Sequence, residues 1–147
     1  MFKVTPDPNN RQVEFQLNHL EEINVRGIRQ AFYAIGAIAK RTINENVLKR
    51  PRSGQVYKYK GRRHRASVEG ESFANRSGDA RRTLGFSVRG AQELEFGFRQ
   101  NEKTMYTKIL EEKRNRPTLR IASKETQGKA VTIMENELKK AHDEGYR

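Results

Sequence analysis

Cysteine is absent from the sequence, and so are long apolar runs. Without cysteine the chain has no disulfide, no zinc-thiolate site and no thiol nucleophile, which agrees with folding in a reducing cytoplasm. No apolar run approaches the ~20 residues that span a bilayer, and the first residues lack the basic and apolar blocks of a signal peptide. We therefore expect a soluble protein that is not exported.

Apolar residues are also scarce, which limits the size of the hydrophobic core. They make up 34% of the 147 residues, charged residues make up 33%, and the mean hydropathy is −0.97. Little apolar surface is available to offset the conformational entropy lost on folding. The length suits a single domain over residues 1–147, and no break in composition divides it. We expect a marginally stable subunit that gains stability by assembling into an oligomer.

Basic residues outnumber acidic ones. Thirty Lys and Arg against eighteen Asp and Glu give a formal net charge of +12 and a pI near 10.2, which favours binding to a polyanion or an acidic protein surface. Because residues 51–78 are rich in Gly and Ser and poor in apolar side chains, the sequence predicts an extended basic loop or β-arm over about residues 50–78. Residues 49–65 contain no acidic residue and eight basic ones, namely Lys49, Arg50, Arg52, Lys58, Lys60, Arg62, Arg63 and Arg65.

Two tyrosines alternate with these cations, an arrangement that single-strand binders use for phosphate contacts combined with base stacking. A solvated loop whose charge prevents aggregation or meets an acidic neighbour explains the composition equally well. The candidate partner-facing or DNA-facing residues are Arg52, Lys58, Lys60, Arg62, Arg63 and Arg65, and the candidate stacking or interface aromatics are Tyr57 and Tyr59.

The N-terminal segment predicts a strand, or a hairpin, followed by a helix. A turn-rich stretch at residues 6–10 separates two short segments in which apolar and polar residues alternate. Asn18 and Glu21 then have the spacing of a capping box, so we expect the helix to begin there. The alternating apolar residues are Phe2 and Val4, then Val13, Phe15 and Leu17.

The next segment predicts the main amphipathic helix. From Ile23 onward apolar residues recur every three or four positions, and we assign this stripe to the core. Gly27 is a candidate break near the start of the helix, and Pro51 ends it. The stripe consists of Ile28, Phe32, Ile35, Ala39, Ile43 and Val47.

The second half of the chain predicts a β-hairpin and two helices. Leu84, Phe86 and Val88 alternate with polar residues, residues 89–92 can turn, and Leu94, Phe96 and Phe98 alternate again. A short helix is expected around Tyr106, Ile109 and Leu110. A C-terminal helix begins at Pro117, which leaves Leu119 and Ile121 to pack on the sheet; its apolar face contains Ala130, Met134, Leu138 and Ala141.

The sequence contains no recognisable motif of an enzyme or of a metal site. His19, His64 and His142 are dispersed, and neither a zinc-protease motif nor a phosphate-binding P-loop is present. The pairs Glu111-x-Lys113 and Glu137-x-Lys139 imitate part of a nuclease motif, but both fall in helical stretches where solvated charges are ordinary. We expect no catalytic, metal-binding or cofactor-binding residue.

Short motifs follow one another in a defined order along the chain. In this order they resemble the family of phage head-tail joining and tail-completion proteins of long-tailed bacteriophages. The chain departs from the family at residues 110–113, where the usual Gly-Thr before a flexible loop is missing. The motifs are Ala39-Lys40-Arg41, then Ser53-Gly54-Gln55-Val56-Tyr57, His64-Arg65-Ala66-Ser67 with Gly70-Glu71, Ser77-Gly78-Asp79-Ala80-Arg81-Arg82-Thr83-Leu84, and Arg116-Pro117-Thr118-Leu119-Arg120.

The resemblance implies a structural virion protein of the phage neck, with no enzymatic activity. It implies an α+β subunit in which a small antiparallel sheet with a hairpin packs against a long helix and a C-terminal helix. Copies would assemble in the host cytoplasm into a ring, expected to be a hexamer, closed by heterologous contacts. The ring would complete the head-proximal end of the tail, contact the tail tube and other neck proteins, and help join the tail to the DNA-filled head.

The basic loop admits a further hypothesis and two rival functions. Part of the charge could face the channel through which DNA passes, where non-specific attraction to phosphate is enough. One rival is a free nucleic-acid-binding protein, supported by the charge and the interleaved tyrosines. The other is a small toxin-type ribonuclease that would use His64, Tyr57 or Arg81 on the phosphate. Only the virion hypothesis accounts for the ordered motifs.

Overall fold

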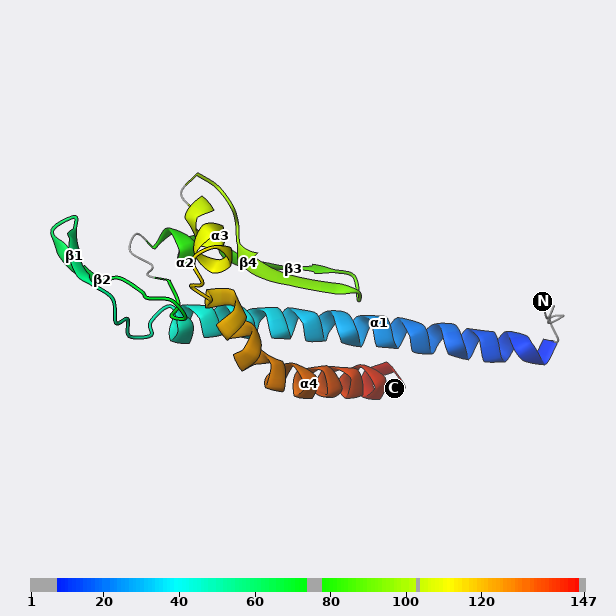
Figure 1. Cartoon of the computed structure of the whole chain (residues 1–147). Helices are drawn as coiled ribbons and strands as arrows, with labels where there is room; N and C mark the ends of the chain where they lie inside the picture. The colour runs from blue at the N-terminus through cyan, green and yellow to red at the C-terminus, as the bar shows by residue number, and fades with distance from the viewer. Residues whose placement is uncertain (1–7, 74–77, 103, 146–147) are drawn as a thin grey trace.

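The computed structural model describes residues 8–73, 78–102 and 104–145, with the side chains of helix α1 described from residue 18 onward. It has the α+β fold class expected from the sequence, built around one long helix, α1 (Figure 1). The hairpin β3–β4 lies along one side of α1, and helix α4 packs along another side. A second, smaller hairpin, β1–β2, projects beyond the C-terminal end of α1.

Each of the two antiparallel sheets has two strands, β1 with β2 and β3 with β4. In chain order the elements are α1 (Pro8–Thr42), a π-helical turn η1 (Ile43–Val47), β1 (Val56–Tyr59), β2 (Arg62–Arg65), α2 (Asp79–Thr83), β3 (Leu84–Arg89), β4 (Glu93–Phe98), α3 (Met105–Glu112) and α4 (Thr118–Gly145).

The predicted N-terminal strand is wrong, because α1 already begins at Pro8. Val13 and Leu17 are four residues apart and therefore also fit a helical repeat, which short alternating runs do not exclude. A proline in the first turn of a helix costs no hydrogen bond, so Pro8 suits its position. Asn18 consequently lies inside α1 and does not cap it. The predicted strand residues Phe2 and Val4 lie outside the described residues.

The end of the long helix agrees with the prediction. The α-helix passes into the π-helical turn η1, in which the Leu48 amide donates to the Ile43 carbonyl at 2.9 Å, and the chain leaves the helix before Pro51. Carbonyls at a helix end have no partner within the helix and need one elsewhere. Here the Ser72 hydroxyl donates to the Val47 carbonyl at 2.7 Å, which joins the helix end to the segment that follows the small hairpin.

The hydrophobic core lies where this helix end meets the hairpin β3–β4 and the start of α4. Phe73 is fully buried, and its ring centroid lies 5.3 Å from that of Phe98 and 6.2 Å from that of Tyr106. Leu119 and Ile121 pack against this cluster, as expected. The buried cluster consists of Ile43, Val47, Leu48, Phe73, Ala80, Leu84, Phe98 and Ala122.

Small residues bring α1 and α4 into close contact. The predicted break at Gly27 is wrong, because α1 continues through it and packs there against α4. A Cβ atom at Gly27 would lie only 3.1 Å from the Ala141 Cβ and from Leu138. Ala141 is buried, and the other members of its predicted apolar face are half-buried. The absence of a Cβ atom at Gly27 therefore allows close packing of α1 against α4 and does not mark a kink.

The hairpin β3–β4 is the most accurate local prediction. Leu84 pairs with Phe98, Phe86 with Phe96, and Val88 with Leu94, so the apolar residues of both strands share one face. That face lies on α1, where the Phe86 ring contacts Tyr33 edge-on with centroids 6.3 Å apart. Gly36 makes this contact close, since a Cβ there would lie 2.4 Å from the Phe86 ring.

Glu111 has a structural role at the start of α4. Its carboxylate accepts hydrogen bonds from the amides of Thr118, Leu119 and Arg120, at 2.7 to 3.2 Å. These amides have no acceptor within the helix, and a negative charge there also interacts favourably with the helix dipole. Pro117 lies immediately before the helix, within one residue of its predicted position. Glu111, which belongs to one of the nuclease-like Glu-x-Lys pairs, thus caps the start of α4.

A glycine of α1, compared with an exposed glycine of α4, tests how α1 packs against the hairpin β3–β4. Gly36→Ala should lower the free energy of unfolding, because the clash with Phe86 costs about 1–3 kcal/mol and exceeds the helix-propensity gain of about 1 kcal/mol. Gly128→Ala is the control, since Gly128 is exposed in α4 and a Cβ there meets no atom within 4 Å. It should raise the same quantity by about 0.5–1 kcal/mol. Urea unfolding measures both, and equal stabilisation by the two changes would contradict the contact.

Candidate functional site: the basic arm

The small hairpin β1–β2, with its flanking residues 52–55 and 66–71, is called the basic arm. Val56 pairs with Arg65, Tyr57 with His64, Lys58 with Arg63, and Tyr59 with Arg62. Opposed residues of a hairpin point to the same side, and successive residues point to opposite sides. The arm therefore has an aromatic face and a basic face. The aromatic face carries Tyr57, Tyr59, Arg62 and His64, and the basic face carries Val56, Lys58, Arg63 and Arg65.

The aromatic face holds the arm together. The Tyr57 and His64 rings stack with centroids 6.0 Å apart, and Tyr59 contacts the same His64 ring edge-on at 6.1 Å. An isolated two-stranded hairpin is only marginally stable in water, and cross-strand ring pairs add roughly 0.2–1 kcal/mol each. The two tyrosines expected as stacking aromatics thus stack within the arm itself, and both are half-buried.

The basic face concentrates charge of one sign. Lys58 and Arg63 are directly opposed across the strands, and like charges in that position are destabilising. Within the described part of the chain, neither of them forms an ion pair with an acidic side chain, nor do Lys60 and Arg62. The Arg65 guanidinium donates to the Gly54 carbonyl at 3.2 Å. An anion placed on this face would relieve the repulsion.

The tip of the arm is a two-residue loop whose backbone places a lysine outermost. Lys60 and Gly61 have φ angles of 49° and 75°, which is the geometry of a type I′ turn. Asparagine or aspartate is preferred at the first of these positions, because a residue with a long side chain is strained at positive φ. The Lys60 Nζ lies 5.6 Å from the centre of the Tyr59 ring. The chain therefore carries a cation where turn geometry favours a different residue.

The base of the arm is closed by hydrogen bonds between its two ends. The Gly54 amide donates to the Ala66 carbonyl at 3.0 Å, and a Cβ at Gly54 would lie 2.5 Å from that oxygen. The Glu71 carboxylate accepts from the Ser53 hydroxyl at 2.6 Å, from the Ser53 amide at 3.2 Å and from the Val68 amide at 3.0 Å. The Ser53 hydroxyl and these amides hold the pKa of Glu71 below its usual value. We call this set of contacts the Glu71 latch.

Arg52 anchors the arm to the body of the protein. Its guanidinium donates to the Leu48 carbonyl at 2.7 Å and to the Phe73 carbonyl at 3.1 Å. Burial lowers its pKa, and the nearby Glu71 charge opposes this effect. Arg50, two residues earlier, pairs with Glu125 of α4. The sequence predicts that Arg52 faces a partner with the other cations, but its guanidinium is turned toward the Leu48 and Phe73 carbonyls.

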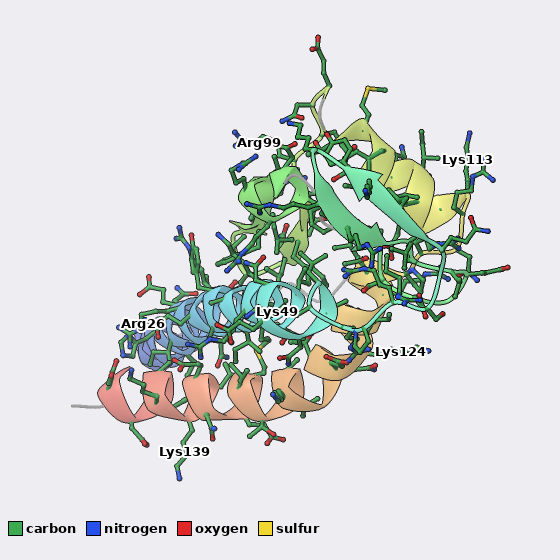
Figure 2. The ribbon with its side chains drawn as sticks, turned by 90° about the vertical axis from the view of Figure 1, so that its left-hand side faces the viewer. Arg26, Lys49, Arg99, Lys113, Lys124 and Lys139 are labelled. Carbon is green, nitrogen blue, oxygen red and sulfur yellow. The ribbon has the colours of Figure 1, made fainter. Side chains whose placement is uncertain are left out.

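A second group of cations, which the sequence analysis did not assign to the site, lies at the base of the arm. The loop between α3 and α4 contains Lys113, Arg114 and Arg116, and Figure 2 shows Lys113 at the end of α3. Asn115 of this loop accepts from the Gly70 amide at 2.8 Å and donates to Glu69 at 3.1 Å. These long-range contacts bring the loop to the base of the arm, and the signal for it in the sequence is the run of cations.

Other kinds of site find little support in the described residues. Among residues 8–73, 78–102 and 104–145, no cluster of three or more His, Asp or Glu could hold a metal ion. In the same ranges, no helix contains a stretch apolar enough to cross a bilayer. His64, a candidate catalytic residue of the ribonuclease hypothesis, lies against the two tyrosine rings of the arm.

Comparison with known proteins does not assign the arm to a family. No protein-family model, no curated protein and no solved structure matches the chain. The motifs Ser53-Gly54 and Gly70-Glu71, which carry part of the resemblance to phage neck proteins, are nevertheless close in space, because Ser53 and Glu71 form the latch. What the arm binds must therefore be argued from its charges and contacts.

Loss of the Glu71 charge should open the base of the arm. Because the folded-state pKa is depressed, the stabilisation is complete above the usual carboxylate pKa and is lost as the pH falls through the lower folded-state value. Glu71→Gln should reproduce the open base at neutral pH. Hydrogen exchange of the Ser53 and Val68 amides, each compared with its intrinsic exchange rate, measures the effect.

Glu69→Gln is the matched control for the latch. Glu69 bonds only the Asn115 side chain among the contacts described above, so this change should leave the protection of Ser53 and Val68 near that of the unmodified protein. Equal amide protection in the unmodified protein and in Glu71→Gln, at neutral and at low pH, would show that the latch does not hold the arm.

Proposed function

We propose that the chain is a structural subunit of the neck of a long-tailed bacteriophage. In this role it completes the head-proximal end of the tail and helps join the tail to the DNA-filled head. The observation that carries the proposal is the basic arm, a projecting hairpin whose base is closed by residues from two of the ordered motifs. A latched arm of this kind is suited to reach a neighbouring subunit or another virion component.

The shape of the subunit supports assembly. The core lies at one end of the molecule, while α1 and α4 extend away from it as a pair of helices (Figure 1). Large apolar side chains remain exposed on three helices, including Tyr33 on α1, Met105 on α3 and Val131 on α4. Contacts between copies would cover such side chains and add stability by mass action. A closed ring, with six copies as the proposed number, is the arrangement we favour.

Free nucleic-acid binding is the second candidate function. It is favoured by the basic face, where Lys58 and Arg63 have no acidic ion-pair partner among the described residues. It differs from the neck proposal in the expected state of the protein, because a free binder would act as a monomer or dimer. The neck proposal includes no catalytic role for the chain. It gives the arm a mechanical task, in which the cations bind a partner while the latch fixes the position of the arm.

Electron microscopy of the purified protein tests the neck proposal. We expect rings of the protein alone, or protein bound to one end of isolated tail tubes or to the portal end of DNA-filled heads. An equally basic protein of similar size, mixed with the same tubes and heads, controls for non-specific attraction. A stable monomer at micromolar concentration that leaves tubes and heads unchanged would exclude the proposal.

A further inference from the structure

We propose that the basic face and tip of the arm form a binding site for the phosphate backbone of duplex DNA. The ligand is recognised by charge, with cations supplied by Lys58, Arg63 and Arg65 on the basic face and Lys60 at the tip. The inference does not depend on the neck proposal, because a free binder could use the same surface. It assigns a ligand to cations for which the described part of the chain provides no acidic ion-pair partner.

The spacing of the cations suits a nucleic-acid backbone. Residues two apart on a strand are roughly 6.8 Å apart, so Arg63 and Arg65 form a short row on one side of β2. Duplex DNA carries one charge per ~1.7 Å of helix axis, so a short row of cations laid on it meets a dense array of phosphates. A two-stranded ribbon is also narrow enough to enter the major groove. The arm can therefore approach a duplex without a fixed position.

The basic face suits a polyanion better than it suits a protein partner. Protein interfaces generally have an apolar or aromatic centre surrounded by polar residues. On the basic face only Val56 is apolar, and the aromatic rings of the arm lie on the opposite face. A surface with cations and almost no apolar contact matches a ligand that is bound through its charge. An acidic protein surface would gain the charge contacts but would lack the apolar centre.

The ring contacts of the arm favour duplex over single-stranded DNA. Proteins that bind single strands stack the bases on accessible aromatic side chains. Tyr57 and Tyr59 are half-buried and each contacts the His64 ring, so their rings are engaged in holding the hairpin. The cations of the basic face point away from them. Phosphate contact without base stacking is therefore the mode that the arm offers.

Binding of a short fluorescent duplex, followed by anisotropy at several salt concentrations, tests the site. For the unmodified protein the logarithm of affinity should fall linearly with the logarithm of salt concentration. The double variant Lys58→Gln with Arg63→Gln should bind more than tenfold more weakly at low salt. Its salt dependence should be shallower by about 1.8 in slope, since each phosphate contact contributes about 0.9.

A matched double variant separates the site from net charge. Lys139→Gln with Lys140→Gln also removes two positive charges, from exposed residues on α4. Figure 2 labels Lys139. The affinity of this variant should stay within twofold of that of the unmodified protein, and its salt-dependence slope within about 0.5. The reason is that these residues make no phosphate contact in the proposed mode. Equal weakening by the two double variants would show that net charge acts without a site, and would overturn the inference.

A change at the tip separates charge from folding of the arm. Lys60→Asn removes a cation and introduces a residue that the type I′ turn prefers, so the hairpin should be at least as ordered as before. The affinity for duplex should nevertheless fall severalfold, with a slope shallower by about 0.9. Unchanged affinity would remove the tip from the site. Circular dichroism and hydrogen exchange of residues 56–65 check that the arm stays folded.

Two further outcomes would overturn the inference. One is the absence of duplex binding at low salt, and the other is tighter, weakly salt-dependent binding of the single strand with the same sequence. Rings or capped tubes combined with no DNA binding would leave the neck proposal standing and exclude this site. Arm-dependent DNA binding by a protein that never assembles would exclude the neck proposal and leave the site standing.

Discussion

Phe73 is the residue on which the rest of the structure depends most directly. Its ring is fully buried beside Phe98 and Tyr106, its amide donates to the Thr118 hydroxyl at 3.3 Å, and its carbonyl accepts from Arg52. One residue thus connects the core, the start of α4 and the arm. In a chain with little apolar surface, such sharing lets a small core position an element that projects from it.

The arm separates two physical tasks between its two faces. Ring contacts on one face supply the cohesion that a free hairpin lacks, and the other face is left to carry charge. Repulsion between opposed cations opposes folding of the hairpin, and the Glu71 latch and the Arg52 anchor act in the other direction. The arm is therefore held from its base and its aromatic face, and not by its charged surface.

The sequence predicted elements whose pattern has one physical explanation. The apolar residues of the strands around Phe86 and Phe96 alternate clearly with polar ones, and the basic arm was predicted from a stretch rich in cations and poor in apolar residues. The N-terminal strand failed because Val13 and Leu17 suit a helix as well as a strand, and only the long repeat that follows extends the helix back to Pro8. The local pattern alone could not distinguish a strand from a helix in this segment.

Two aspects of the site depend on contacts between distant residues and were therefore not predictable. Arg52 belongs to the same run of cations as Lys58, and nothing in the run indicates that its guanidinium meets the carbonyl of Phe73. The cations of the α3–α4 loop lie at the base of the arm because Asn115 forms hydrogen bonds with residues 69 and 70. Gly27 was misjudged for the same reason, since its neighbour Ala141 lies far along the chain.

The length of α1 has a consequence for any assembly of this chain. A 35-residue helix spans about 52 Å, and the arm projects at its C-terminal end, while α4 ends at Gly145 beside its N-terminal half. The two ends of each copy therefore differ in structure. In a closed ring of identically oriented copies, the basic arms would gather at one rim or radius and the far end of the helix pair at another. Such a ring would present two chemically distinct sides, and a partner that recognises one of them would dock in a single direction.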